Sequence, residues 1–370
     1  MLPAMSRFAL DVLAHPIVQA PMGGGPSTPA LAAAVSGAGG LGFLVAGYRP
    51  LHAIRADLDE VRSLLPDRTP FGVNVFAPPG RGSGAAEIAA YAGTLADEAA
   101  RQDVELGTPR WDDDHYADKL DLLGAERVPV VSFTFGCPSR GDVDRLHAAD
   151  AAVWVTVTTP PEAQAARAVG ADALIVQGVE AGGHRGGFDD AAPGDIGLLA
   201  LLQLVRAAVG AELPLVGTGG VANGRAVAAV LAAGAAAAGL GTAFMLCPEA
   251  ATGFAHREAI EHGSAATALT RAFTGRTARG ITNRFLREHS ADAPSAYPEV
   301  HHLTAPVRAA ARVRGDADGL HLWAGQAYHL AEQIPAAELV AQLAEQTRAA
   351  LRLATARIDR PAQDQRSRPD

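Results

Sequence analysis

The chain has 370 residues, of which 48% are hydrophobic and 19% charged, and its 31 Lys and Arg against 40 Asp and Glu give a formal net charge of −9. This length suits a large α/β barrel with an addition, and it excludes the small scaffolds that depend on disulfides or structural metals. Without a basic block we expect no nucleic-acid partner, and with only Cys137 and Cys247 we expect no disulfide framework and a cytoplasmic location.

Two segments bear on membrane targeting. Arg7 and Asp11 interrupt the apolar core that a signal peptide needs. Residues 226–248 carry no charge, but the pattern changes at Gly234 from a helix-like run to a buried strand and its loop. We therefore expect neither a leader nor a membrane span.

Short apolar runs alternate with helical stretches along most of the chain. Most of these runs are rich in Val and Ile without polar alternation, as in parallel strands that are covered on both faces. The predicted strands are 16–21, 41–46, 71–77, 128–135, 152–159, 171–177, 213–217 and 235–240. Eight such units predict a TIM (β/α)8 barrel, with an open doubly wound sheet as the alternative.

Helix signals separate these runs. Residues 26–38 begin with Ser27 and Thr28 as candidate caps, and the helices predicted at 161–169 and 224–233 end at a glycine. We expect a barrel at 1–263, closed by a helix at 335–358 that packs through Val340, Leu343, Ala350 and Ala354. An enlarged crossover at 78–124, an added smaller subdomain at 264–334 over the active site and a disordered tail at 359–370 complete the predicted organisation.

Glycine-rich loops follow three predicted strands, at the barrel end where active sites form. They are APMGGG at 20–25, GTGGVANG at 217–224 and GLGTAF at 239–244. The first is either a plain turn or a place where a flat ligand approaches the backbone. The other two lie about twenty residues apart on neighbouring strands, where free N–H groups commonly hold a phosphate.

The loop after the sixth strand, QGVEAGGHRGGF at 177–188, is the most informative segment. His184 lies among glycines there, so a neutral imidazole can act as a base near pH 7. Glu180 and Arg185 either orient the substrate or form a solvated ion pair, and we favour the ion pair for Arg185.

Other polar residues are ambiguous. Asn74 and Gln177 lie near strand ends and either meet a heterocycle or hydrogen-bond inside the barrel. The sequence has no P-loop, HExxH, clustered metal ligands or GxSxG, and we interpret both cysteines as structural.

Taken together, these loops resemble the nitronate monooxygenase family, formerly called 2-nitropropane dioxygenases, and within it the class I bacterial enzymes. The matching blocks are APMGGG, FGVNVFAPP, VEAGGHRG, GTGGV, GLGTAF, residues 270–285 and LWAGQ, and they span most of residues 16–329. The resemblance implies FMN held in a TIM barrel, and oxidation of alkyl nitronates by O2 through a flavin semiquinone to an aldehyde or ketone and nitrite. It also implies propionate 3-nitronate as the substrate, no metal, and a monomer or homodimer.

The resemblance assigns roles to individual residues. His184 would be the catalytic base or the electrostatic partner of the nitronate. The implied cofactor-binding residues are Met22, Gly23, Gly24, Asn74, Gln177, Gly182, Gly183, Gly219, Gly220, Gly239, Gly241 and Thr242. After LWAGQ the chain has Ala327, Tyr328 and His329 where a glycine is expected, so Tyr328 and His329 could narrow the cavity.

Three alternative functions remain open. Related flavin barrels include NADH:quinone reductases and FMN-dependent enoyl-ACP reductases, and the loop at 77–84 could serve as a lid in either. IMP dehydrogenase-like barrels use a loop cysteine after the sixth strand, which this chain lacks. A flavin- or phosphate-binding protein without catalysis would require His184 to be incidental.

Overall fold

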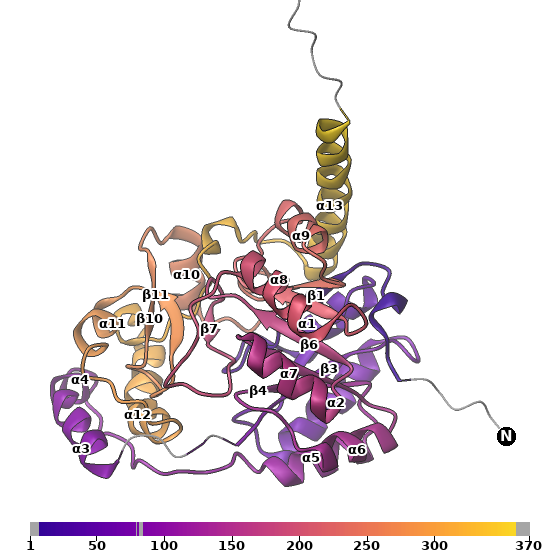
Figure 1. The fold of residues 1–370 in the computed structure, drawn as a ribbon. Coiled ribbons are helices and arrows are strands. Elements are labelled where there is room, and N and C mark those ends of the chain that lie inside the picture. The colour runs from indigo at the N-terminus through magenta and orange to yellow at the C-terminus, as the bar shows by residue number, and fades with distance from the viewer. Residues whose placement is uncertain (1–6, 79, 81–83, 360–370) are drawn as a thin grey trace, which may run out of the picture.

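The computed structural model describes residues 7–78, 80 and 84–359. Eight parallel strands form one sheet in the order β1-β9-β8-β6-β5-β4-β3-β2 (Figure 1). A parallel bridge between Val18 and Leu41 joins the first strand to the last, beside a hydrogen bond of 2.9 Å from Gln19 N to the carbonyl of Leu41. The sheet therefore closes into a TIM barrel, and the alternative of an open sheet is wrong.

Each predicted barrel strand has one counterpart in the structure. The barrel strands are β1 (Ile17–Gln19), β2 (Phe43–Val45), β3 (Gly72–Phe76), β4 (Val130–Thr134), β5 (Ala152–Val157), β6 (Ala173–Gln177), β8 (Leu215–Thr218) and β9 (Ala237–Leu240). They are shorter than the apolar runs because the run ends continue into loops. Nearly every strand residue is buried, which explains the lack of polar alternation.

Helices surround the barrel. They are α1 (Pro29–Gly37), α2 (Leu51–Leu64), α5 (Tyr116–Ala125), α6 (Arg140–Ala148), α7 (Pro160–Val169), α8 (Leu198–Val209) and α9 (Gly224–Ala232). The first helix begins at Pro29 because Thr28 Oγ1 caps Leu31 N at 3.0 Å. Ser27 instead accepts the N–H of Met22 at 2.9 Å and so closes the loop before the helix.

The barrel interior is filled at one end by large side chains. Trp154 and Phe43 are fully buried there with ring centroids 5.7 Å apart. Phe8 and the residues around the 3₁₀ turn η1 (Leu10–Val12) pack against this cluster. Because this end is filled, the opposite end, where the strands terminate, is the one that holds a ligand.

A second hydrophobic core lies beside the barrel. It is built on a three-stranded sheet of β10 (Thr267–Thr270), β11 (Ala278–Ile281) and β7 (Gly183–His184), with α10 (Phe254–His262), α11 (Arg284–His289), α12 (Glu299–Arg314) and the 3₁₀ turns η3 (Ala317–Gly319) and η4 (Tyr328–Leu330). The helices α3 (Ala85–Thr94) and α4 (Ala96–Gln102) lie against α12, as Figure 1 shows. Tyr91 is buried with Phe273 and Phe285, and its hydroxyl donates to the carbonyl of Ala272 at 2.6 Å. The sequence predicts the crossover at 78–124 as a segment separate from the subdomain at 264–334. In the structure both segments contribute to this second hydrophobic core.

The last helix, α13 (Ala336–Ile358), has the predicted bounds but packs only through its first half. Val340 and Leu343 are buried, whereas Ala354 is exposed, so the prediction was wrong for the second half. Thr347 Oγ1 donates to the carbonyl of Gly224 at 3.2 Å and thereby fixes the packed half against α9. Beyond that point the helix projects from the body, as Figure 1 shows.

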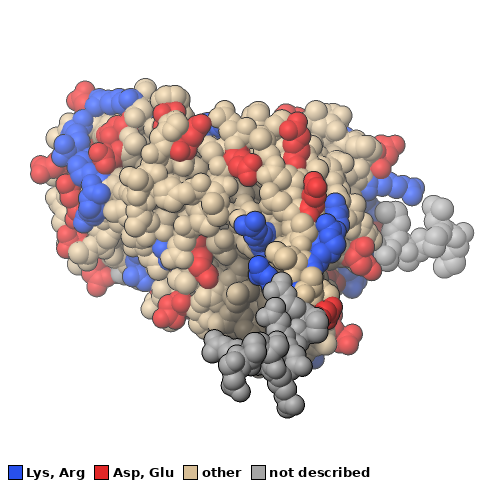
Figure 2. All heavy atoms as spheres, turned by 90° about the horizontal axis from the view of Figure 1, so that it is seen from above, with Lys and Arg blue, Asp and Glu red and all other residues tan. Residues whose placement is uncertain are grey.

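Charges of both signs are interspersed over the face shown in Figure 2, with broad uncharged areas between them. Among the described residues no helix is long and apolar enough to cross a membrane. The expectations for the loop at 77–84 and the tail at 359–370 concern segments that lie largely outside the described residues.

Candidate functional site

A cavity of about 600 Å³ opens at the C-terminal ends of the barrel strands. One side of it, which we call the barrel wall, comes from the strand ends and their glycine loops. The other side, the cap wall, consists of His301, Arg308, Arg312, His321, Trp323 and Tyr328. All of the predicted site residues line this cavity: Met22, Gly23, Gly24, Asn74, Gln177, Gly182, Gly183, His184, Gly219, Gly220, Gly239, Gly241 and Thr242. Residues from six separate loops or strands thus meet in one place.

The glycine loops of the barrel wall present backbone rather than side chains to the cavity. Gly219 and Gly220 adopt φ angles of 119° and 68°, which other residues rarely adopt. Within the described chain, the N–H groups of Gly219, Gly220 and Gly241 donate no hydrogen bond. A side chain at Gly239 would place its Cβ 3.0 Å from that of Thr218. The glycine loops therefore form a concave surface with free backbone N–H donors, and such a surface can bind a phosphate group.

Asn74 and Gln177 take part in internal hydrogen bonds. Asn74 Nδ2 donates to Ser132 Oγ and Thr134 Oγ1, both at 2.9 Å. Gln177 Oε1 accepts the N–H of Gly186 at 2.8 Å, and its Nε2 donates to the carbonyl of His184 at 3.1 Å. Gln177 thus shapes its own loop, while Asn74 Oδ1 has no partner in the described chain and remains available at the cavity.

His184 belongs to the strand β7, which pairs antiparallel with β11 of the added sheet. Its Nε2 lies 2.9 Å from Thr274 Oγ1, and that hydroxyl donates to the carbonyl of Arg276 at 3.2 Å. When the threonine proton is donated to that carbonyl, Oγ1 accepts from His184, and the imidazole proton is then on Nε2. The lone pair of Nδ1 has no partner in the described chain and is free for a ligand.

The charge state of His184 follows from its surroundings. Burial, together with the nearby Arg276, lowers the pKa of His184 to about 3. The imidazole is therefore neutral at physiological pH. This favours a proton-accepting role over that of a cationic partner, between which the sequence left the choice open.

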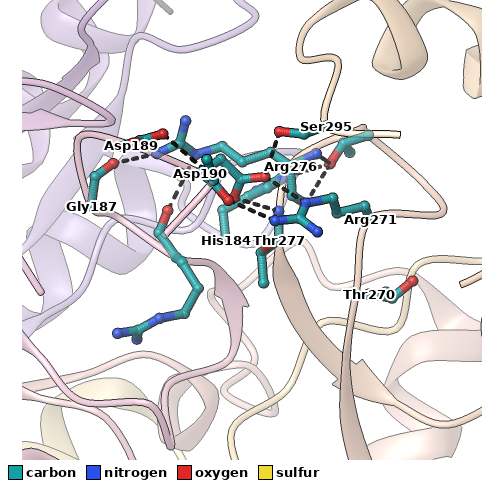
Figure 3. A network of polar contacts seen from close by, with 12 residues as sticks. His184, Gly187, Asp189, Asp190, Thr270, Arg271, Arg276, Thr277 and Ser295 are labelled. Atoms are coloured by element: carbon teal, nitrogen blue, oxygen red, sulfur yellow. Dashed lines mark hydrogen bonds and ion pairs between the residues drawn. The ribbon is translucent and has the colours of Figure 1, made fainter. Parts of the chain in front are cut away.

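A polar network braces the segment that carries His184 (Figure 3). Asp190 pairs with Arg271 Nε at 2.7 Å and accepts the N–H of Thr277 at 2.9 Å. Arg276 donates to the carbonyl of Gly187, and its guanidinium lies 4.2 Å from the ring centroid of Phe135. These contacts tie the loop after β6 to the added sheet, so the position of His184 depends on both cores.

The interpretation of Arg185 as half of a solvated ion pair was wrong. Its side chain is only 1% exposed, and it donates to the carbonyl of Gly178 and to Gln177 Oε1. Glu180 accepts the N–H of Leu198 at 3.0 Å at the start of α8. Both side chains hold the loop in shape, because the glycines around them supply no side-chain contacts of their own.

Of the two large side chains after LWAGQ, Tyr328 and His329, only the first lines the cavity. Tyr328 is buried, lines the cavity and donates to the carbonyl of Ala265 at 2.8 Å. His329 is exposed and is not part of the lining, so its predicted role was wrong. The 3₁₀ turn η4 points the two neighbouring side chains in different directions.

Sequence reasoning missed several lining residues. Tyr48 lies in the loop after β2, three residues beyond its end, so the rule of searching strand ends could have found it. Its hydroxyl accepts from that of Tyr297 at 3.0 Å, and its ring stacks on His301 with centroids 4.3 Å apart. His301 and Arg308 lie on α12, far along the chain from any barrel strand, and no local motif marks them.

Both cysteine thiols are held in the protonated form. Burial raises the pKa of Cys137 to about 11 and that of Cys247 to about 12. Neither residue lines the cavity. A role for either thiol as a nucleophile is therefore disfavoured.

Comparisons with known proteins agree with this geometry. The nitronate monooxygenase family model matches residues 6–346. The chain is 44% identical to a nitronate monooxygenase of Pseudomonas aeruginosa over 346 residues, covering 90% of this chain and 96% of the relative. It is 40% identical to a nitronate monooxygenase of Paraburkholderia phytofirmans over 341 residues, covering 89% and 91%.

Solved structures give the same picture. A nitroalkane oxidase from Streptomyces ansochromogenes superposes with a TM-score of 0.89 at 50% identity, covering 93% of this chain and 99% of that one. FabK from Thermotoga maritima superposes with a TM-score of 0.73 at 25% identity, covering 94% and 98%.

Proposed function

Because this chain belongs to the nitronate monooxygenase family and is thus an oxidoreductase, we propose that it uses FMN and O2 to oxidise alkyl nitronates to an aldehyde or ketone and nitrite. Propionate 3-nitronate is the proposed substrate. The observation that carries the proposal is the neutral His184, with an unpartnered Nδ1, on the wall of a cavity whose other side is a cradle of unpaired N–H groups.

The barrel wall fits FMN. Gly219, Gly220, Gly241 and Thr242 would hold the phosphate, since three of these residues have free N–H donors. The segment from Met22 to Gly24 would lie along the ring system, and Asn74 Oδ1 would accept from its N–H edge. When bound, the flavin supplies the electron transfer from nitronate to O2, while the protein supplies binding and electrostatics.

The chain's own residues would deliver the substrate in its reactive form. Nδ1 of His184 takes the α-proton of a nitroalkane, because the imidazole is neutral and Thr274 fixes its orientation. The hydroxyl of Tyr48 accepts from Tyr297, so its own proton is free to donate to a nitro oxygen. The part of the chain at 264–334 would cover the bound substrate and keep water away.

The test is anaerobic mixing of the purified, FMN-loaded protein with propionate 3-nitronate and, separately, with NADH. We expect a change in flavin absorbance with the nitronate, no change with NADH, and nitrite release once O2 is admitted. Rapid bleaching by NADH without a response to nitronate would move the protein to the reductases. A protein that takes up no flavin would refute both functions.

A further inference from the structure

The cavity lining is strongly biased in charge. It contains two arginines, Arg308 and Arg312, and no Asp or Glu among its described residues. Both arginines belong to α12 and are one turn apart, so they lie on the same helix face. The barrel wall contributes no charged side chain. Positive charge is therefore concentrated in the cap wall, away from the glycine cradle.

Arg308 is a buried cation without a counter-ion. Its side chain is only 7% exposed, and in the described part of the chain it forms no ion pair. Its Nε donates to Thr304 Oγ1 at 3.0 Å and its Nη2 to the carbonyl of His301 at 2.7 Å. Its Nη1 donates to no group in the described chain, and Arg308 is one of the residues that line the cavity. Two N–H bonds of a buried guanidinium are thus left for a ligand.

The groups around Arg308 do not neutralise it. Burial is the main cause that lowers the pKa of His301 to about 2 and that of His321 well below its ordinary value, so both are uncharged. Burial raises the pKa of Tyr48 to about 12, so no phenolate is present. The pKa of Arg308 falls only to about 10, and it stays protonated. A buried, unpaired cation is unfavourable unless an anion binds beside it.

Arg308 lies in the same cavity as His184 but on a different element, α12 instead of β7. The ring of Tyr297 is 6.1 Å from that of His184 and 6.4 Å from that of His301, which Arg308 contacts. His184, His301 and Arg308 line one cavity, so a substrate whose reacting carbon lies at His184 can extend its other end toward α12.

We propose that Arg308 is a specificity-determining residue that binds a carboxylate at the far end of the nitronate substrate through its free Nη1. This inference rests on the proposed function, since it assumes that the reacting end of the substrate lies at His184. A charge-assisted contact in a buried site favours a carboxylate-bearing nitronate over one of similar size without a carboxylate. Flavin binding does not require Arg308, because the cradle lies on the barrel wall.

The experiment compares propionate 3-nitronate, a dianion, with the nitronate of 1-nitrobutane, a monoanion of similar length that lacks the carboxylate. We expect Arg308→Met to lower kcat/KM for the carboxylate substrate by about 10- to 100-fold, mainly through KM, and to change kcat/KM for the nitronate without a carboxylate by less than about threefold. Arg308→Lys keeps the charge and should retain part of the preference. Arg314→Met is the matched control, because Arg314 is on the same helix, exposed and outside the cavity lining.

A second measurement does not depend on turnover. Calorimetry with 3-nitropropionate should give a Kd at least tenfold higher for Arg308→Met than for the wild-type protein or for Arg314→Met. Equal losses for both nitronates together with an unchanged Kd would overturn the inference and leave Arg308 a structural role. Loss of NADH binding in Arg308→Met, with the carboxylate preference intact, would also overturn it and assign the site to a nucleotide phosphate. If the wild-type protein oxidises neither nitronate, the proposed function fails, and the calorimetric result alone decides whether Arg308 binds a carboxylate.

Discussion

The barrel wall and the cap wall of the cavity present different kinds of chemical group to a ligand. The barrel wall presents glycines and free backbone N–H groups at the ends of a rigid sheet. The cap wall presents large and ionisable side chains, including Arg308, His301 and Trp323, on a second hydrophobic core. Backbone N–H donors bind a phosphate group and fit the shape of a ligand. Side chains distinguish ligands by charge and can transfer protons. If FMN occupies the barrel wall, as we propose, the cofactor site and the substrate specificity can change independently.

His184 lies where these two regions meet, and the largest expected effect follows from its replacement. We expect His184→Asn to lower kcat/KM for a neutral nitroalkane by about 100- to 10,000-fold, because no group is left to take the α-proton. A preformed nitronate needs no proton removal and should lose far less. The absorbance spectrum should show that flavin is retained. Loss of flavin together with activity would contradict the separation of the two walls.

The brace between the two cores has the next largest effect. Asp190→Asn removes the charge that pairs with Arg271, and we expect it to lower the free energy of unfolding by about 1–3 kcal/mol. Asp189→Asn is the matched control, because Asp189 is exposed and accepts only the N–H of Ala191. Denaturant titration of both variants measures the difference. Equal stability of the two variants would show that the network in Figure 3 does not fix the segment.

A substitution in the barrel wall should affect the cofactor rather than the chemistry. Gly219 has φ 119°, and an added Cβ would lie 3.1 Å from the carbonyl of Gly178. We expect Gly219→Ala to cost about 1–2 kcal/mol and to weaken FMN binding, measured by flavin fluorescence. The flavin-loaded fraction should keep the substrate preference of the wild-type protein. Gly93→Ala, in the helix α3 with nothing within 4 Å of the new methyl group, is the control.

The smallest expected effect is on the pH profile. An ordinary histidine base loses activity below its pKa of 6.5, but the pKa of His184 is lowered to about 3. Between pH 8 and 5 we therefore expect less than about a twofold loss of kcat/KM with a nitroalkane from ionisation of His184. The free energy of unfolding does depend on pH in this range. The unfolded chain protonates His184 below about pH 6.5, whereas the folded chain protonates it only near pH 3. The melting temperature should fall as the pH drops through that window. A half-loss of activity near pH 6.5 would refute the assignment.

Much of the site could be predicted because its signals are local. Each barrel strand is a short apolar run, and each glycine loop directly follows a strand, so the topology brings Gly219, Gly241 and His184 to one end of the barrel. The burial of the Arg185 side chain was predicted wrongly. It depends on how the loop folds back on Gln177, and the local sequence does not indicate that fold. The exposure of His329 and Ala354 was also predicted wrongly. His329 is exposed because of the direction of the turn η4, and Ala354 because the helix α13 extends beyond the surface on which it packs.

The sequence by itself determined the positions of the strands along the chain, the positions of the glycine loops and the bounds of the last helix, because period, composition and capping act over a few residues. Only the tertiary structure decided that α3 and α4 share a core with α12, that Thr274 fixes the proton of His184, and that Arg308 reaches the same cavity. These facts depend on contacts between segments up to two hundred residues apart, whose energies come from burial and complementary shape. Local patterns carry no record of such contacts.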